Sequence, residues 1–317
     1  MTDIPDYPVG TPIPLPACGT WPESVHVFDA KTVAALRAAE AAGRPLLMRG
    51  EPGTGKSQTA RAAAAWAKRL FLSVVIDGRT EAQDLLWRYD AVARLSDAQL
   101  QAHGARDAYH YLSPGPLWWA YHWEGAHKQW EPRKQGEVPE APPDWQEQQG
   151  TVLLMDEIDK ADPDLPNAFL ELLANRAFTV PYLGQKVVSG ARAPLVVITT
   201  NEERELPNAF LRRCMVLTLS LPADLKPWLV RMATIHLERQ EALKPRIFPE
   251  LLGKAADLLI AERTELEREQ VYAPGLAEYL DLAHALARLG KTEKQQENLL
   301  QEVAGFALRK SAPDKLR

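Results

Sequence analysis

The sequence feature that most constrains the fold is the segment from Gly50 to Ser57, which reads GEPGTGKS. It fits the pattern G-x-x-x-x-G-K-[ST], in which backbone N–H groups and a lysine cradle phosphates while a hydroxyl group reaches Mg²⁺. The apolar run 46–48 before it predicts a strand, and the alanine-rich run 58–70 after it predicts a helix. Because the motif requires this order of strand, loop and helix, a phosphate-binding loop is favoured over an ordinary turn.

Length and composition set the broad class of protein. A chain of 317 residues exceeds the size at which single cores stop growing, so we expect two domains. Its apolar content of 46% and charged content of 25% are those of a globular protein and exclude disorder of the whole chain. The net charge of −5 gives none of the basic excess that non-specific nucleic-acid binding requires. Cys18 and Cys214 lie too far apart in sequence to suggest a disulfide framework or a zinc site.

The first segment, residues 1–21, is expected to be an extended arm. Six prolines lie between positions 5 and 22, which blocks a helix and disfavours a central strand. The segment has no basic stretch followed by an apolar run, so it does not resemble a secretory signal. The chain also has no run of 18 apolar residues that would predict a membrane span. We therefore expect a cytoplasmic protein.

Four further apolar runs predict strands that complete a sheet, at residues 72–76, 151–155, 195–198 and 215–219. Two stretches interrupt the pattern and are interpreted as insertions, at about 88–116 and 124–149. The second has no helical or strand period and predicts a long surface loop. Its tryptophans, Trp130 and Trp145, either anchor a partner or pin the loop to the body of the protein. A hairpin is expected between residues 178 and 188.

Polar residues follow two of the predicted strands and precede a third. Asp156 and Glu157 end the run at 151–155, where an open α/β sheet binds its ligand and where acids can hold Mg²⁺ and activate water. Asn201 ends the run at 195–198, although an asparagine in that position is more often a turn residue. Arg212 and Arg213 precede the last strand, either as solvated side chains or as arginines that act in a neighbouring subunit.

From residue 222 the apolar spacing becomes helical to the end of the chain. Four helices are predicted, at 228–243, 249–268, 276–289 and 293–307. We expect a small all-α domain over residues 222–317.

Taken in order, these motifs resemble those of an AAA+ ATPase. The run DEIDKA at 156–161, the hairpin at 178–188 and Thr199-Thr200-Asn201 are similar to the MoxR group of that family. The resemblance implies an AAA+ P-loop NTPase fold: an α/β domain at 22–221, with a five-stranded parallel sheet flanked by helices, followed by an α-helical lid domain at 222–317.

The resemblance also implies roles for the matched residues. Lys56 would contact the β- and γ-phosphates of ATP, Ser57 and Asp156 would hold Mg²⁺, Glu157 would activate water, and Asn201 would be the sensor-1 residue. Arg213 is the first choice for a finger acting on the adjacent subunit, with Arg212 as the alternative. The residues expected to bind the cofactor are Gly50, Glu51, Pro52, Gly53, Thr54, Gly55, Lys56, Ser57, Gln58 and Asp156.

As a function, the resemblance implies an oligomeric ATPase, in a hexameric ring, that remodels or activates a partner protein bearing a von Willebrand factor A domain. ATP is assigned over GTP by the resemblance only. Two alternatives remain: an AAA+ motor or loader on nucleic acid, which the acidic composition disfavours, and a low-turnover nucleotide switch. The switch is kept because residues 273–278 contain no arginine where many AAA+ proteins have a second sensor.

Overall fold

The structure is a computed structural model. It is described for residues 4–99, 107–132, 134, 136–162, 165–169, 172, 175–180, 184–190, 192–239, 248–269 and 273–309. The chain forms two compact units, which we describe separately. The first comprises residues 1–21, 26–50 and 56–218, and the second comprises residues 22–25, 51–55 and 219–317.

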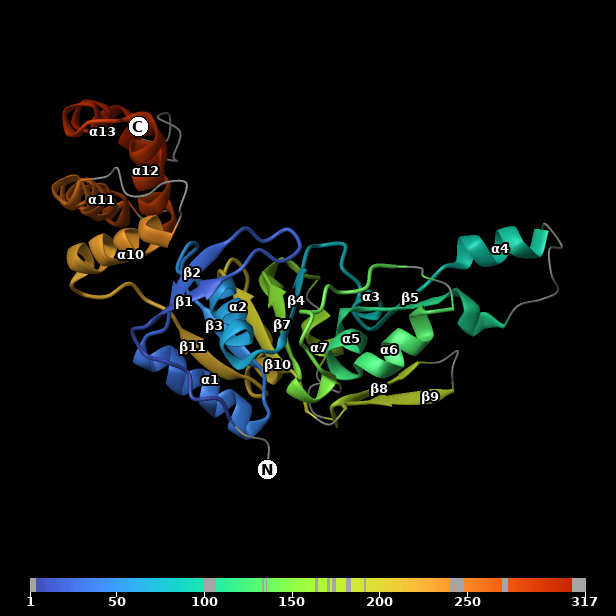
Figure 1. Cartoon of the computed structure of the whole chain (residues 1–317). Helices are drawn as coiled ribbons and strands as arrows, with labels where there is room; N and C mark the ends of the chain where they lie inside the picture. Colours follow the sequence, from blue (N-terminus) through green and yellow to red (C-terminus); the bar gives the residue numbers. More distant parts are fainter. Residues whose placement is uncertain are drawn as a thin grey trace. The chain divides into compact units, whose positions relative to one another are not determined.

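A five-stranded parallel sheet forms the centre of the first unit (Figure 1). Its order is β11-β3-β10-β7-β4. This confirms the predicted sheet, and the strands are β3 (Leu46–Arg49), β4 (Leu70–Val75), β7 (Thr151–Asp156), β10 (Leu195–Thr200) and β11 (Met215–Thr218).

Both faces of the sheet are covered. Leu153 and Met155 belong to a core cluster with Trp118 and Phe178, while the alternate residues Val152 and Leu154 point to the opposite face and are equally buried. Figure 1 shows helix α2 (Lys56–Ala67) lying across the sheet, where it packs against β7 and β4. This burial on two sides explains why the strands are continuous apolar runs rather than alternating ones.

Helix α1 (Ala30–Ala42) leads into β3, the strand before the phosphate-binding loop. The Asp29 side chain caps it by accepting from the Thr32 N–H at 2.7 Å. It ends at Gly43, whose φ of 59° is a left-handed conformation that glycine adopts without strain. The helix packs against β11 and β3.

The N-terminal segment is more structured than the proline spacing predicts. It contains β1 (Pro12–Leu15), which pairs with β2 (Ser24–Val27) in a small sheet of its own. Tyr7, Ile13 and Leu15 are buried, so this segment packs on the body of the first unit. The prolines exclude a central strand, but they tolerate a two-stranded edge sheet.

The first insertion forms a separate small layer. Helix α3 (Ala82–Leu86) leads into β5 (Trp87–Tyr89), which pairs antiparallel with β6 (Leu112–Pro114). Between them lie α4 (Ala91–Gln99) and the 3₁₀ helix η1 (Ala108–Tyr111).

The second insertion corrects the predicted surface loop. After α5 (Pro116–Tyr121), residues Trp123–Trp130 form helix α6, and the 3₁₀ helix η2 (Glu147–Gln149) precedes β7. Trp145 packs edge-on against Trp123, with ring centres 5.0 Å apart, and donates its indole N–H to the Gly150 carbonyl. These tryptophans pack against the core, so the pinning alternative describes them better than a partner anchor.

The predicted hairpin is confirmed as β8 (Ala177–Val180) and β9 (Gln185–Val188). Its Phe178 ring stacks on Trp87 and meets Trp118 edge-on, with ring centres 6.1 Å apart in both pairs. The hairpin is therefore joined to the first insertion and to α5. The short elements that complete this unit are η3 (Ile158–Lys160), α7 (Leu165–Ala168) and α9 (Asn208–Leu211).

The second unit is helical. Its helices are α10 (Leu225–Arg239), α11 (Pro249–Arg268), α12 (Leu276–Leu289) and α13 (Glu293–Leu308). Buried residues recur at helical spacing, for example Leu229, Ala233 and Leu237 in α10, and they meet in one cluster. At the start of α12 the Glu278 carboxylate accepts from the Gly275 N–H at 2.8 Å.

Two details complete the description. Cys18 and Cys214 are both free thiols. Among the helices of the described residues, none is both long and apolar enough to cross a membrane.

The stability of the helical unit should depend on pH through His236. Burial, with the nearby His284, lowers the pKa of His236 from 6.5 to about 4. Between pH 4 and pH 6.5, His236 binds a proton in the unfolded chain but not in the folded unit. The stability that the neutral His236 side chain contributes is therefore fully present above pH 6.5 and is lost as the pH falls towards 4. We expect a loss of about 1–3 kcal/mol between pH 7.5 and pH 4.5, measured by hydrogen exchange of α10 amides. His236→Gln should weaken this pH dependence, and an unchanged dependence would contradict the assignment.

Candidate active site

The carboxyl ends of β3, β7 and β10 lie side by side at one edge of the sheet. β10 pairs with β3 on one side and with β7 on the other. Polar residues that are 99 and 145 positions apart in the sequence therefore converge, as expected for a site at the carboxyl edge of an open α/β sheet.

Lys56, the first residue of α2, points into this edge. Its Nζ donates to the Gly50 carbonyl at 2.6 Å and to Asn201 Oδ1 at 2.8 Å. Burial lowers the pKa of Lys56, and the carboxylates of Asp156, Asp159 and Glu157 oppose that shift. A largely buried ammonium group beside a phosphate-binding loop is suited to bind an anion.

Ser57 and Asp156 are joined directly. The Ser57 hydroxyl lies 3.0 and 2.9 Å from the two carboxylate oxygens of Asp156. One hydroxyl and one carboxylate form an oxygen donor set that fits Mg²⁺, which usually keeps several waters and binds substrate phosphates as well. The described residues form no cluster of three or more acidic, histidine or cysteine side chains that could hold a metal by themselves. The geometry therefore fits a cation that is bound jointly by Ser57, Asp156 and a phosphate group.

Glu157 lies beside the pair of Ser57 and Asp156, and its backbone conformation is unusual. Its φ of 61° is left-handed, and its N–H donates to Thr199 Oγ1 at 3.0 Å. One carboxylate oxygen of Glu157 is 2.9 Å from the Lys160 ammonium, and the other is 3.5 Å from the Asn201 amide nitrogen. The side chain is about one third exposed, so water can reach it.

Two positioning residues were missed by sequence reasoning. Thr199 donates its hydroxyl hydrogen to Asp156 while accepting from the Glu157 N–H, so it orients both acids. Asp159 is buried and accepts from the backbone N–H groups of Asn201 and Glu203, at 3.2 and 3.0 Å. The structure rather than the sequence reveals the contact of Thr199, because Ile198 pairs with Met155 and this places the following residues, Thr199 and Asp156, side by side.

Removing the Thr199 hydroxyl should impair hydrolysis without unfolding the protein. Thr199→Val keeps the shape of the buried side chain but deletes its contacts to Asp156 and Glu157. We expect kcat to fall by roughly 10- to 100-fold, the usual effect of losing a partner that orients a metal ligand. Thr200→Val is the matched control, because the Thr200 hydroxyl bonds to the Glu202 N–H instead. Equal kcat values for the two variants would exclude the positioning role.

Arg212 and Arg213 do not join this group. Both are exposed and immediately precede β11, so they lie at the amino edge of the parallel sheet, opposite the edge that holds Lys56 and Asp156. The Arg213 guanidinium donates to the Ala209 carbonyl at 3.0 Å, and the Arg212 carbonyl accepts from Arg44.

The tip of the phosphate-binding loop, residues 51–55, belongs to the second unit. Gly53 and Gly55 have φ values of 76° and 86°, which residues with side chains adopt only with strain, and a side chain at position 53 would also crowd Ala277 of α12. Within this unit Arg263 of α11 donates to both carboxylate oxygens of Glu51, at 2.9 and 2.8 Å. The pairing of the Arg263 side chain with the loop was not expected from the sequence.

Gln58, the last predicted ligand of the loop, lies in α2. Its side-chain oxygen is buried and has no hydrogen-bond partner within the part of the chain that the structure describes. A buried acceptor without a partner can accept a hydrogen bond from a bound ligand.

Comparisons with known proteins agree with this geometry. The model of the family described as "AAA domain (dynein-related subfamily)" matches residues 45–214, more than half of the chain. A search of curated proteins returned no match.

Three solved structures are among those to which this chain is similar. NtrX from Brucella abortus is 17% identical with a TM-score of 0.50, and the match covers 83% of this chain and 50% of NtrX. A Cytophaga hutchinsonii ATCC 33406 protein described as an ATPase is 15% identical, with a TM-score of 0.38 and coverage of 87% and 79%. The RuvB Holliday junction branch migration motor of Thermotoga maritima is 14% identical, with a TM-score of 0.46 and coverage of 87% and 67%. At 17% identity the likeness to NtrX concerns the fold alone.

Proposed function

The chain belongs to the AAA domain family, dynein-related subfamily, and from that premise we propose that it is an ATPase that works as an oligomer. The observation that carries this proposal is the convergence of two motifs. Lys56 lies 2.8 Å from Asn201, and Ser57 lies within 3.0 Å of Asp156. A loop that binds phosphates and an acid that can hold a cation thus meet beside a solvent-accessible glutamate.

Each residue has a chemical task in this proposal. Lys56 exchanges its contacts with Gly50 and Asn201 for the β- and γ-phosphates. Glu157 accepts a proton from the attacking water, and the Asn201 amide orients that water or the γ-phosphate. Mg²⁺, held by Ser57 and Asp156, would neutralise the phosphate charge that develops during transfer.

The arginines before β11 suit a site shared between subunits. Because Arg213 lies at the amino edge, it is suited to act in a neighbour's site, with Arg212 as the alternative. Arg213→Ala should leave nucleotide binding intact and reduce kcat by roughly 10³-fold or more.

Mixing two inactive variants tests the shared site. An Arg213→Ala subunit keeps its own Glu157, and a Glu157→Gln subunit still supplies Arg213 to its neighbour. In a 1:1 mixture, about a quarter of the sites should regain activity if subunits assemble at random in a closed ring. A mixture that stays inactive while native mass spectrometry shows mixed oligomers would contradict the arrangement, and repeating it with Arg212→Ala identifies the finger.

We propose that the chain is a MoxR-like protein that forms a hexameric ring and remodels or activates a protein bearing a von Willebrand factor A domain. The support is the DEIDKA run at 156–161, together with the hairpin β8–β9. Capturing partners on a Glu157→Gln variant held with ATP tests this, with Lys56→Ala as the nucleotide-free control. Recovery of no such domain in the ATP-specific fraction would oppose the partner assignment.

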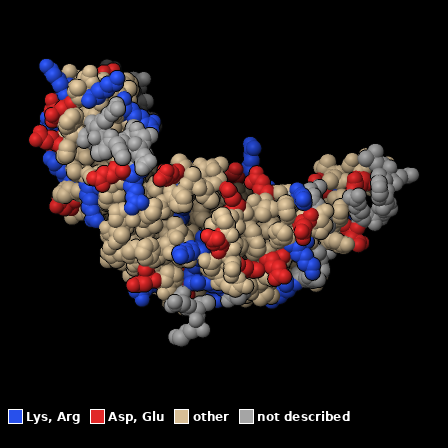
Figure 2. Space-filling view, in the orientation of Figure 1, with Lys and Arg blue, Asp and Glu red and all other residues tan. Residues whose placement is uncertain are grey.

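A motor or loader on nucleic acid is the second candidate. The acidic composition disfavours it, and Figure 2 shows acidic and basic side chains interspersed on the face in view rather than gathered into a basic stripe. Stimulation of ATP hydrolysis by single-stranded or duplex nucleic acid that falls steeply with salt would favour this candidate.

A low-turnover nucleotide switch is the third candidate. It is favoured by residues 273–278, which contain no arginine at the position of a second sensor. One burst of product per site, followed by turnover limited by nucleotide release, would support the switch over continuous hydrolysis.

A further inference from the structure

A pocket of about 570 Å³ lies in the first unit, away from the candidate active site. It is lined by the last turn of α1, by Arg69 just before β4, by the residues flanking the hairpin β8–β9 and by the start of β10. All of these precede strands of the sheet, so the pocket lies at the amino edge, whereas Lys56 and Asp156 lie at the carboxyl edge. Its volume is within the range of small-molecule sites.

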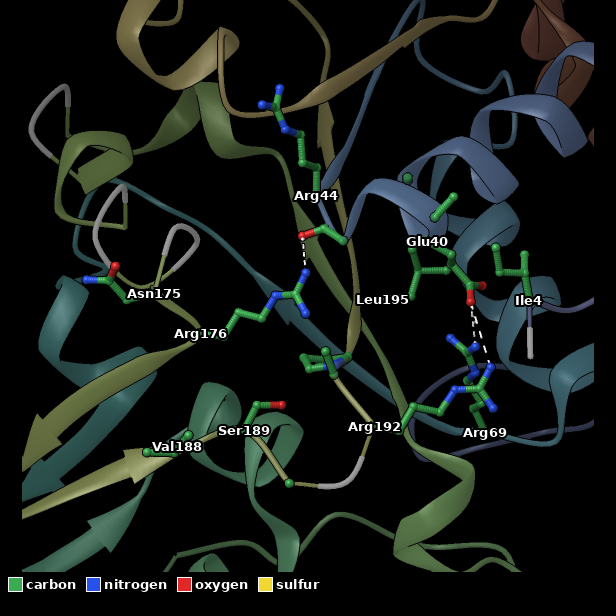
Figure 3. A pocket seen from close by; sticks show the side chains of 16 residues that line it. Ile4, Glu40, Arg44, Arg69, Asn175, Arg176, Val188, Ser189, Arg192 and Leu195 are labelled. Atoms are coloured by element: carbon green, nitrogen blue, oxygen red, sulfur yellow. Dashed lines mark hydrogen bonds and ion pairs between the residues drawn. The ribbon is translucent and has the colours of Figure 1, made fainter. Parts of the chain in front are cut away.

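Positive charge dominates this pocket. Figure 3 shows Arg69 and Arg192 beside Glu40 on one side, and Arg176 on the other. Glu40 is the one acidic side chain among the 16 described residues that line it. Its carboxylate lies 2.6 Å from Arg69 and 3.8 Å from Arg192. A fourth arginine, Arg44, points away from the other three and donates to a backbone carbonyl. Three guanidinium groups and one carboxylate leave a net charge of about +2 facing the pocket.

Two polar atoms that line the pocket lack hydrogen bonds. Arg69 Nε and Ser189 Oγ are both buried and have no hydrogen-bond partner within the described part of the chain. Arg69 is only 4% exposed, so its orphaned N–H is costly unless a ligand or water satisfies it. These atoms point to a missing acceptor.

Arg176 is held in place for a ligand. It donates to the Gly43 carbonyl at 3.1 Å, and a side chain at position 43 would collide with its guanidinium group. Its φ of 50° is left-handed, a conformation that is uncommon for residues other than glycine. The side chain nevertheless remains exposed, so an incoming ligand can reach it.

We propose that this pocket binds the phosphate group of a small molecule. Guanidinium forks bind phosphate and carboxylate oxygens in pairs. Charge favours phosphate over carboxylate. A phosphomonoester carries about −1.5 to −2, which balances the net charge of the pocket, whereas a single carboxylate carries only −1. Arg176 and Ser189 flank the hairpin, so an occupied pocket ties the base of β8–β9 to α1 and β4.

Isothermal titration with inorganic pyrophosphate tests the proposal. The full-length Lys56→Ala variant is used so that the phosphate-binding loop does not compete. We expect one site per chain, and Arg176→Gln in the same background should weaken binding by roughly 10-fold or more. Ser189→Ala should weaken it less. Arg37→Gln is the matched control, since Arg37 lies on α1 but pairs with Asp6 outside the pocket.

Three outcomes would overturn the proposal. The first is no binding of pyrophosphate to the Lys56→Ala variant. The second is equal affinity in the Arg176→Gln and Arg37→Gln variants, provided that thermal melting shows both to be folded. The third is tighter binding of citrate or of an oligoglutamate peptide than of pyrophosphate, which would assign the pocket to carboxylates.

Discussion

Replacing Lys56 with alanine should abolish nucleotide binding, with a loss of affinity of roughly 100-fold or more. The buried ammonium group is positioned by Gly50 and Asn201. Titration with a fluorescent ATP analogue measures the effect. Lys128→Ala, which removes an exposed lysine on α6, is the matched control.

Loss of binding in this variant should not reflect unfolding. Burial lowers the pKa of Lys56, which means that its charged form is held in the folded protein at a cost. The nucleotide-free variant should therefore melt at the wild-type temperature or above it. If Lys56→Ala binds ATP with wild-type affinity, the loop has another role and the ATPase proposal fails.

Replacing Glu157 with glutamine should separate binding from hydrolysis. The amide keeps the shape of the side chain but cannot accept a proton from water, so kcat should fall by roughly 10²- to 10⁴-fold. ATP affinity should stay within about threefold of wild type, because Lys56, Ser57 and Asp156 are untouched. Single-turnover hydrolysis and nucleotide titration measure the two quantities.

The matched control for this variant is Glu203→Gln. Glu203 follows β10 at the same edge of the sheet, and its side chain is exposed. The kcat of the Glu203→Gln variant should remain near the wild-type value. A Glu157→Gln variant that still turns over at the wild-type rate would show that another group activates the water.

The positions of the main site residues could be predicted because local patterns determine them. Four apolar residues followed by Asp156 and Glu157 describe a strand buried on both faces whose end carries the acids. Parallel strands present their ends at one edge, so the approach of Asp156 to Ser57 follows from the order of the motifs.

Features that depend on contacts between distant segments were not predictable. The stretch 124–149 has no regular period, yet Trp123 to Trp130 are helical, because their ring packing against the core supplies stability that local propensity does not. Likewise, neither the spacing nor the charge of Arg263 indicates its pairing with Glu51, more than 200 positions away.

The sequence by itself determined the parallel sheet, the phosphate-binding loop, the acids at a strand end and the helical C-terminal region, because each is encoded in short-range spacing and burial. Only the tertiary structure decided that Thr199 orients Asp156 and Glu157, and that Arg69, Arg176 and Arg192 line one pocket. These groups come from separate elements, and their meeting depends on strand register and packing that no single segment contains.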